Sequence, residues 1–387
     1  MTGRRIFLVA GEPSGDQHGA ALVRELRRLA PEVELVGLGG RRMEEEGMTL
    51  RADLAGHAIV GFTEVVRHFP EVRAMFHSTV AEFDRSPPDA VVLIDYPGFN
   101  LRLSREAKRR GIRVVYYISP QLWAWGRGRL RKMAQWVDLM LVILPFEEKL
   151  YRDVDMRAEF VGHPLLDEMA QYEFDEKLVA RWTSDGRSPI FGLLPGSRVQ
   201  EIVRLLPVMA GAARLLRNDY PAGRYLVPLI DEECASAARQ ILSSYPDAGL
   251  ELAVGRVQEV LRSASVCMIA SGTATLQAAI CGTPMVVAYK LSRASYLVAR
   301  LLVRVDHISL VNILAGGPLV PEFVQRQARP EAIAQAVRQI LTEPEMRHRM
   351  IAGLSEVHRR LGEPGASRRA AERILEEIDG AGRRRPA

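Results

Sequence analysis

The stretch Val266–Leu291, VCMIASGTATLQAAICGTPMVVAYKL, decides how the fold of this chain is interpreted. Its two short apolar runs, Val266–Ala270 and Met285–Tyr289, are typical of buried strands. Between them, Ser271-Gly272-Thr273 predicts a turn, and Ala274–Cys281 has the composition of a helix. Strand, turn, helix and strand in this order make one parallel crossover unit.

The turn at Ser271-Gly272-Thr273 has two interpretations. A turn of small residues before a helix offers unpaired backbone N–H groups and the positive end of the helix dipole, and so favours an anion. The same residues also fit an ordinary tight turn between a strand and a helix. This stretch alone leaves both interpretations open.

The same strand–turn–helix pattern occurs twice more. The run Arg5–Ala10 precedes GEPSGD (11–16) and a helical pattern over Gly19–Leu29. GEPSGD lacks both the Lys-Ser/Thr ending of a Walker A loop and the GxGxxG dinucleotide fingerprint, and its two carboxylates suit a helix cap as well as a ligand. Ile190–Leu194 precedes PGSR (195–198), with a helix expected from about residue 202 to 216.

Alternating strands and helices predict an α/β fold built on parallel sheets. With 387 residues, the chain is too long for one ordinary core and indicates two Rossmann-like domains. We expect an N-terminal domain over residues 1–166, a second domain over 167–361 that the polar run Asp167–Ser188 introduces, and a C-terminal segment over 362–387.

Composition excludes several classes of protein. The three cysteines have no metal-ligand spacing, which indicates thiols in a reducing cytosol and predicts no metal site. No apolar run approaches the roughly 18 residues of a membrane span. The net charge of +5 comes with basic clusters but no nucleic-acid-binding motif. These basic clusters fit solvated faces of helices, or sites that bind an anionic surface or a phosphorylated substrate.

Asp95 is the first candidate for catalysis. It follows the apolar strand Ala90–Ile94, and the residues just beyond such a strand face the ligand crevice of a parallel sheet. A carboxylate there can deprotonate an alcohol, whereas the alternative is an Asp bonded to its own loop, expected at Tyr96–Asn100. His163 is a second acid or base candidate, with a structural role in a hinge as its alternative.

Arg198 is the candidate for holding phosphate in the second domain. Its guanidinium and the N–H groups of the PGSR turn suit a diphosphate. The alternative is a capping box made by Ser197 and Gln200.

A third feature is Ile59–Phe83, which interleaves large apolar and basic side chains. It fits either a helix packed on the core or one that docks on lipid.

In order and content, nine motifs resemble those of the lipid-A-disaccharide synthase family, and they cover nearly the whole chain. They are AGEPSGD (10–16), GFTEVV (61–66), IDYPGFN (94–100), YYISPQLWAWG (116–126), LPFEEKLY (144–151), FVGHPLLDEM (160–169), LLPGSR with Glu201 (193–201), ASGTATL (270–276) and DHISLVNILAG (306–316).

The resemblance implies the GT-B architecture, with two Rossmann-like domains, an active site between them and a C-terminal helix that crosses back. It implies a metal-independent, inverting transfer from UDP-2,3-diacylglucosamine to 2,3-diacylglucosamine 1-phosphate (lipid X), without a cofactor. The product would be lipid A disaccharide 1-phosphate. It also implies peripheral attachment to the cytoplasmic face of a Gram-negative-type inner membrane, whose surface is anionic. The apolar and basic segments Phe62–Phe83 and Tyr296–Arg304 would dock on that membrane. The resemblance leaves open whether the protein forms a homodimer.

The resemblance also implies roles for individual residues. Asp95 matches the carboxylate that acts as general base, and Glu12 and Ser14 match the loop that places the acceptor or the donor phosphates. Arg198 matches the cation for the UDP diphosphate. The further UDP contacts that it implies are Glu201, Ser271, Gly272, Thr273, Ala274, Thr275 and Gln277.

Two positions need separate treatment. Asn312 matches a polar position whose role the resemblance leaves open. Gln277 stands where the family usually has Glu, whose carboxylate can accept hydrogen bonds from ribose hydroxyls. An amide oxygen accepts such a bond without charge, so we expect weaker binding of UDP than with Glu.

Two other functions share these sequence features. One is another UDP-sugar enzyme of the same fold, such as a sugar-nucleotide epimerase, which needs no site for acyl chains. The other is a non-catalytic nucleotide- or lipid-binding protein on the same scaffold. Its expected sign is the loss of the catalytic carboxylate, and Asp95 is present.

Overall fold

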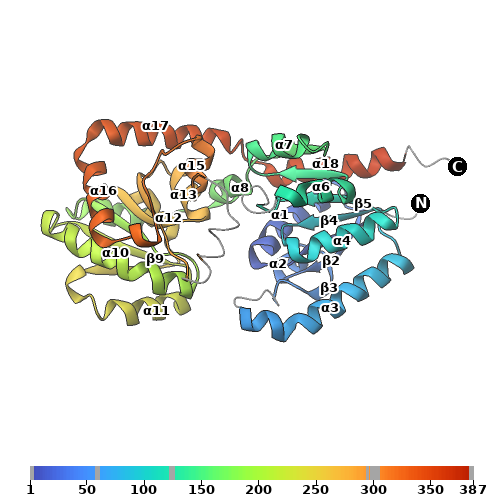
Figure 1. Cartoon of the computed structure of the whole chain (residues 1–387), viewed down its shortest axis with the longest axis horizontal. Coiled ribbons are helices and arrows are strands. Elements are labelled where there is room, and N and C mark those ends of the chain that lie inside the picture. The colour runs from blue at the N-terminus through green and yellow to red at the C-terminus, as the bar shows by residue number, and fades with distance from the viewer. Residues whose placement is uncertain (1–3, 57–61, 122–126, 293–295, 297–305, 383–387) are drawn as a thin grey trace. The chain divides into compact units, whose positions relative to one another are not determined.

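The fold is described from a computed structural model, over residues 4–56, 62–121, 127–292, 296 and 306–382 (Figure 1). The chain forms two units, one of Met1–Ala170 with Leu361–Ala387 and the other of Gln171–Arg360. The sequence placed this boundary at residue 166 and kept the C-terminal segment apart. In the structure, that segment belongs to the first unit, as the C-terminal helix that the resemblance implied would cross back.

The first unit contains a seven-stranded parallel sheet in the order β3-β2-β1-β4-β5-β6-β7. Every residue of β1 and β4 is buried, because helices cover both faces of the sheet. The strands are β1 (Arg5–Ala10), β2 (Glu34–Gly39), β3 (Thr49–Asp53), β4 (Ala90–Ile94), β5 (Arg113–Tyr117), β6 (Leu139–Val142) and β7 (Ala158–Phe160).

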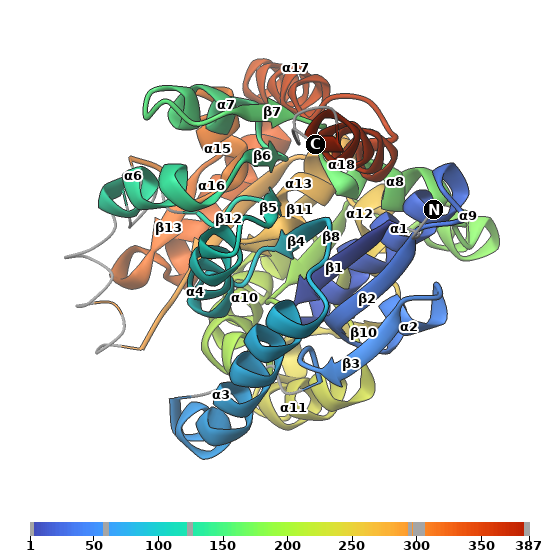
Figure 2. The same cartoon turned by 90° about the vertical axis from the view of Figure 1, so that its right-hand side faces the viewer.

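Side chains that alternate along each strand build two cores in this unit. Ile6 and Leu8 of β1 belong to a core with α1 and α18, whereas Phe7 and Val9 belong to a core with α3 and α4 (Figure 2). The helices of this unit are α1 (Pro13–Leu29), α2 (Arg41–Glu45), α3 (Phe62–Arg85), α4 (Pro97–Arg109), α6 (Arg127–Trp136), α7 (Pro145–Arg152), α8 (Pro164–Gln171) and α18 (Ala366–Gly382).

The second unit contains a six-stranded parallel sheet in the order β10-β9-β8-β11-β12-β13. The strands are β8 (Ile190–Leu194), β9 (Arg224–Leu229), β10 (Leu250–Val254), β11 (Val266–Ala270), β12 (Met285–Tyr289) and β13 (Glu322–Val324). The helices are α9 (Glu176–Ser184), α10 (Val199–Asp219), α11 (Glu232–Leu242), α12 (Val257–Ser263), α13 (Thr273–Ile280), α15 (Leu310–Ala315), α16 (Pro330–Thr342) and α17 (Pro344–Arg360), with 3-10 turns at Pro246–Ala248 and Gln325–Gln327. The crossover unit predicted around β11, α13 and β12 is confirmed.

Each sheet has one topological switch point. In the first unit the chain runs from β1 outward to β3 and then returns to the other side of β1 as β4. In the second unit it runs from β8 outward to β10 and returns beside β8 as β11. Ligands of open α/β sheets bind beyond the carboxyl ends of the strands at such points. The fold therefore indicates one binding position in each unit.

Two predicted loops are too long for the same reason, a proline that opens a helix. The GEPSGD turn is shorter than expected because α1 begins at Pro13, and the expected loop at residues 96–100 is instead the start of α4 at Pro97. Proline lacks an N–H and has a fixed φ, so it suits the first position of a helix. The polar run at residues 167–188, expected to be a linker, contains the end of α8 and all of α9.

The described part of α3 packs on the first unit. Four of its apolar side chains, and the buried Phe83, lie against the core: Val72, Met75, Phe76 and Val80. The default interpretation of this helix, that it packs on the core, therefore holds over residues 70–85. The side chains of residues 62–69, and residues 297–305, lie outside the described part of the chain. Among the described residues, no helix combines the length and apolar character needed to cross a bilayer.

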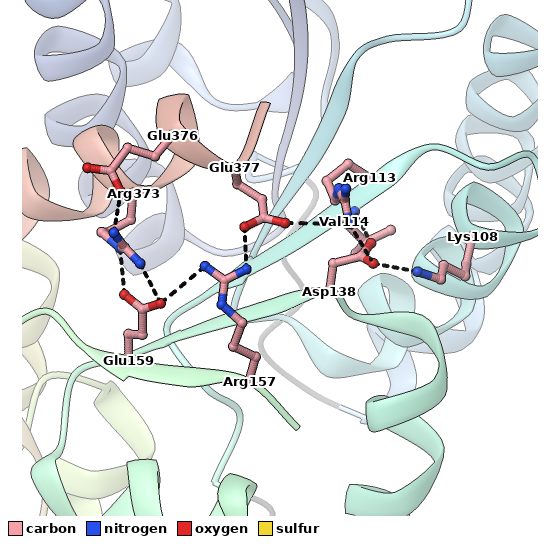
Figure 3. Close-up of polar contacts among 9 residues, drawn as sticks. All are labelled: Lys108, Arg113, Val114, Asp138, Arg157, Glu159, Arg373, Glu376 and Glu377. Atoms are coloured by element: carbon pink, nitrogen blue, oxygen red, sulfur yellow. Dashed lines mark hydrogen bonds and ion pairs between the residues drawn. The ribbon is translucent and has the colours of Figure 1, made fainter. Parts of the chain in front are cut away.

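An ion-pair network attaches α18 to the first unit (Figure 3). The nearly fully buried Glu377 accepts a hydrogen bond from Arg157 at 2.6 Å and lies 3.5 Å from Arg113. Glu159 of β7 pairs with Arg157 at 3.3 Å and with Arg373 of α18 at 2.5 Å. Arg113 opens β5, so this network lies toward the amino ends of the strands, away from the switch point. It serves the attachment of the C-terminal helix.

We expect Glu377→Gln to lower the free energy of unfolding of the first unit by about 1–3 kcal/mol, because charge-assisted hydrogen bonds become neutral in a buried place. The matched control is Glu372→Gln on the same helix, since Glu372 is 40% exposed and pairs with Arg368 rather than with the network, and its loss should stay within about 0.5 kcal/mol. Urea denaturation of both variants measures the difference. Equal stabilities for the two variants would show that the network contributes nothing specific.

Candidate functional site

Two carboxylates meet at the switch point of the first unit. Ala10 of β1 is paired with Ile94 of β4, so the next residues of both strands leave the sheet side by side. Glu12 and Asp95 therefore come from neighbouring strand ends. Burial, and after it the negative charge of Glu12, raise the pKa of the Asp95 carboxyl to about 6, although the N–H of Tyr96 stabilises its ionised form. A carboxylate with such a pKa is ionised at pH 7 and a stronger base than an ordinary Asp.

The rest of the first loop divides into ligand-facing and structural residues. Ser14 lies exposed in the first turn of α1, where its hydroxyl is accessible to a ligand. Asp16 is buried, and its carboxylate accepts hydrogen bonds from the N–H groups of Gly40, Arg42 and Met43 at 2.8–3.2 Å. Asp16 thus caps α2. The alternative that the two carboxylates of this loop cap the helix that follows is wrong, since Glu12, the N-cap residue of α1, makes no capping hydrogen bond and Asp16 is bonded to α2.

His163 lies buried in this unit, near His18 of α1. Its Nδ1 accepts a hydrogen bond from the N–H of Leu165 at 3.1 Å. Burial, and after it the charge of His18, lower the pKa of His163 to about 3. Burial lowers the pKa of His18 to about 4, although Glu168 lies 3.5 Å from its Nδ1. Neutral, internally bonded imidazoles favour the structural interpretation of His163.

Arg198 and its neighbours lie at the switch point of the second unit. Leu194 of β8 pairs with Ile269 of β11, which brings the PGSR turn beside the turn at Ser271. Arg198 is the N-cap of α10, its side chain is 63% exposed, and Nη1 lies 3.8 Å from the Glu201 carboxylate. A weakly paired, exposed guanidinium at a helix N-terminus is suited to a phosphate.

Glu201 stabilises the turn beside Arg198. Its carboxylate accepts a hydrogen bond from the N–H of Ser197 at 3.0 Å. Gly196 has a φ of 117°, and a Cβ there would lie 2.2 Å from the same carboxylate, so only glycine fits. The alternative of a capping box made by Ser197 and Gln200 is wrong: the helix begins at Val199, earlier than expected, and its N-cap residue is Arg198, whose side chain makes no capping hydrogen bond.

The turn of the opening stretch presents its first residues outward. Gly272 and Thr273 are exposed, and Ser271, Ala274 and Gln277 are half-buried. Ser271 donates its hydroxyl to the carbonyl of Ile308 at 3.2 Å. Thr275 is buried and donates its hydroxyl to the carbonyl of Gly272 at 2.8 Å. A ligand would therefore meet the backbone of this turn before it met the Thr275 side chain.

Asn312 is 1% exposed, and its amide is fully engaged. It donates to the carbonyl of Val320 at 2.9 Å and to the Glu322 carboxylate at 2.8 Å, and it accepts from the N–H of Val320 at 2.8 Å. Glu322 also accepts from the N–H groups of Ile308 and Ser309, at 3.0 and 2.9 Å. Asn312 and Glu322 thus support the segment that Ser271 contacts. No motif in the sequence pointed to Glu322.

The described residues contain no group of three or more His, Cys, Asp or Glu side chains that would hold a metal ion. The cysteines are free thiols, two of them buried.

Comparison with known proteins decides the family. A family model described as lipid-A-disaccharide synthetase matches residues 6–378. The chain belongs to the lipid-A-disaccharide synthase family. It is 42% identical over 375 residues to the lipid-A-disaccharide synthase of Syntrophus aciditrophicus, which covers 97% of this chain and 98% of the relative. It is 40% identical to that of Myxococcus xanthus, over 96% of this chain and 97% of the relative.

The enzyme is therefore a glycosyltransferase with lipid-A-disaccharide synthase activity in lipid A biosynthesis. Solved structures show the same GT-B fold. The UDP-GlcNAc 2-epimerase of Neisseria meningitidis, bound to UDP-GlcNAc, matches 96% of this chain and 99% of its own, with a TM-score of 0.63 and 13% identity. The calicheamicin glycosyltransferase CalG4 matches 98% of this chain and 100% of its own, with a TM-score of 0.61 and 16% identity. At these identities the likeness concerns the fold alone, so it gives no support to an epimerase.

Proposed function

We propose that the enzyme transfers diacylglucosamine from UDP-2,3-diacylglucosamine to the 6-hydroxyl of 2,3-diacylglucosamine 1-phosphate, lipid X. The products are lipid A disaccharide 1-phosphate and UDP. The family membership supports the substrates. The observation that supports the chemistry is the carboxylate of Asp95, which combines a raised pKa with a position at the switch point of the first unit.

The roles follow from the charges that change during the reaction. Asp95 accepts the proton of the 6-hydroxyl while the oxygen attacks the anomeric carbon, and the bond from that carbon to the UDP oxygen breaks. Attack from the opposite face inverts the anomeric centre. Negative charge then grows on the diphosphate, where Arg198 and the N–H groups before α13 stabilise it. Every step uses side chains or backbone of this chain.

The remaining residues have supporting roles in this proposal. Glu12 and Ser14 place the acceptor sugar or the donor phosphates beside Asp95. Glu201, Ser271, Gly272, Thr273, Ala274 and Thr275 form the donor turns together with Arg198, partly by fixing their shape. Asn312 acts through its hydrogen bonds to Glu322, which support the backbone that Ser271 contacts.

We also propose a cellular setting from the chemistry of the substrates. Both carry acyl chains, so the enzyme would work at the cytoplasmic face of the inner membrane of a Gram-negative-type bacterium, attached peripherally through anionic lipid. A homodimer is part of the same proposal. Flotation with vesicles that contain anionic lipid, and light scattering of the free enzyme, test these two points separately.

A single assay tests the transfer. The enzyme is incubated with UDP-2,3-diacylglucosamine and lipid X, and the products are resolved by mass spectrometry. We expect disaccharide 1-phosphate and UDP in equal amounts. Consumption of the UDP-sugar without disaccharide would contradict the proposal and favour an epimerase or a hydrolase.

Gln277 allows a gain-of-affinity prediction. If it accepts a hydrogen bond from the ribose, Gln277→Glu adds charge to that bond, which is worth about 1 kcal/mol, or about fivefold in the Kd of UDP. Calorimetric titration with UDP measures both proteins. Gln240→Glu, a change of the same kind at an exposed position of α11, serves as the control and should leave the Kd unchanged. Weaker binding by Gln277→Glu would show that the ribose does not meet this side chain.

A further inference from the structure

The backbone at Asp95 has an unusual conformation. Asp95 and Tyr96 have φ values of 44° and 47°, so two adjacent residues other than glycine adopt the left-handed region. There the Cβ approaches the carbonyl oxygen, which disfavours the conformation, most strongly for a bulky residue such as tyrosine. Such a pair persists only where the surroundings hold it in place.

Two buried side chains hold the main-chain carbonyl of Asp95. Asn100 donates its Nδ2 to this oxygen at 2.8 Å and to the carbonyl of Ile94 at 3.1 Å. The Tyr116 hydroxyl donates to the same Asp95 oxygen. Asn100 and Tyr116 are fully buried. Burial holds the pKa of Tyr116 well above its usual value, so its hydroxyl keeps the proton that it donates.

The first loop completes this arrangement from the other strand. A Cβ at Gly11 would lie 2.1 Å from Cδ1 of Tyr96, so the Tyr96 ring can occupy its place only over a glycine. Glu12 follows directly, and its charge contributes to the raised pKa of Asp95. The conformation of residues 95–96 therefore depends on contacts from β1, α4 and β5.

We propose that Asn100 and Tyr116 are positioning residues for the glycosyl transfer. By bonding to the main-chain carbonyl of Asp95, they hold this residue in its left-handed conformation and thereby fix the direction of its carboxylate. Once the carbonyl is fixed, the Cα–Cβ bond has one direction, and the carboxylate stays in the buried place beside Glu12. This inference rests on the proposed role of Asp95 as the base.

Tyr117 offers a matched control for Tyr116. Both tyrosines are buried in β5, but their rings belong to opposite faces of the sheet, with Tyr117 in the core that contains α18. Tyr117 contacts Asp95 only by accepting its N–H through the main chain, at 3.1 Å, and a change of the ring leaves that bond in place. Each Tyr→Phe change removes one buried hydroxyl from the same strand.

The kinetic constants of Tyr116→Phe and Tyr117→Phe are measured in the full-length enzyme across pH 4.5–8. We expect Tyr116→Phe to lower kcat about tenfold or more while the KM for lipid X stays within about twofold, because a loosened base loses alignment. The acid limb of the pH profile of kcat should move to lower pH in Tyr116→Phe. A carboxylate that can turn toward water has a pKa closer to that of an ordinary Asp. Tyr117→Phe should have the same kcat, and the same acid limb of the pH profile, as the unaltered enzyme. Asn100→Ser, which shortens the donor, should behave like Tyr116→Phe.

Thermal unfolding separates positioning from simple stability. A purely structural role predicts that both Tyr→Phe variants keep the kcat per folded molecule of the unaltered enzyme, whatever stability each one loses, and that result would overturn the inference. Asp95→Asn, assayed in parallel, separates this failure from failure of the proposed base. If Asp95→Asn is inactive and Tyr116→Phe is fully active, the base stands and the positioning role falls. If Asp95→Asn is active, both fall.

Discussion

Asp95→Asn is expected to lower kcat by about 10²–10⁴-fold, because an amide cannot accept the proton of the attacking hydroxyl. The size and shape of the side chain are nearly unchanged, and Asn tolerates the left-handed conformation as well as Asp does. The fold and the binding of UDP should therefore be preserved. Initial rates with saturating substrates give kcat, and calorimetric titration with UDP gives the Kd.

The control for this change is Asp84→Asn, the same substitution at an exposed carboxylate of α3 that pairs with Arg110. We expect full activity from it. Asp95→Asn with kcat within tenfold of the unaltered enzyme would remove Asp95 from the mechanism. An inactive variant that also fails to bind UDP would instead indicate that the substitution disturbs the fold.

Arg198→Ala is expected to lower kcat/KM by about 10²–10³-fold. The guanidinium is the exposed cation at the N-terminus of α10, and the diphosphate gains negative charge as the bond to the sugar breaks. Because that charge is larger in the transition state than in the bound donor, kcat should fall in addition to the affinity for the UDP-sugar. Steady-state kinetics with the donor varied at saturating lipid X separate the two effects.

Two companion variants sharpen this test. Arg204→Ala removes a guanidinium from the same helix, where it lies 3.4 Å from Gln200, and should retain activity. Arg198→Lys keeps the positive charge but loses the planar guanidinium that can bind phosphate through two hydrogen bonds. Its kcat/KM should therefore lie between the values of the unaltered enzyme and Arg198→Ala. A similar loss for Arg198→Ala and Arg204→Ala would point to a general effect of positive charge rather than to a diphosphate contact.

Local patterns predicted most of the secondary structure, because strands and helices follow from short-range periodicity. The apolar runs of β1, β4, β8, β11 and β12 were all predicted from sequence. The errors lie at helix starts, where Pro13 and Pro97 were interpreted as loop residues although they open helices. A proline in a short motif fits both places, and only the backbone that follows distinguishes them.

For the site, the sequence by itself determined which residue types follow which strands. It placed Asp95 after β4 and Arg198 after β8, and the order of the motifs identified the family, since each of these features is read along the chain. Asn312 shows the limit of that information. The sequence marked it as a polar site candidate and left its role open, whereas in the structure its amide is buried and bonded to Val320 and Glu322.

Only the tertiary structure decided which of these residues come together. β4 lies beside β1 and β11 lies beside β8, so Glu12 raises the pKa of Asp95, and the turn at Ser271 lies beside that of Arg198. The left-handed conformation of Asp95 is set in the same way, by side chains from α4 and β5. The physical reason is that strand pairing and burial depend on contacts between distant segments, which no local pattern encodes.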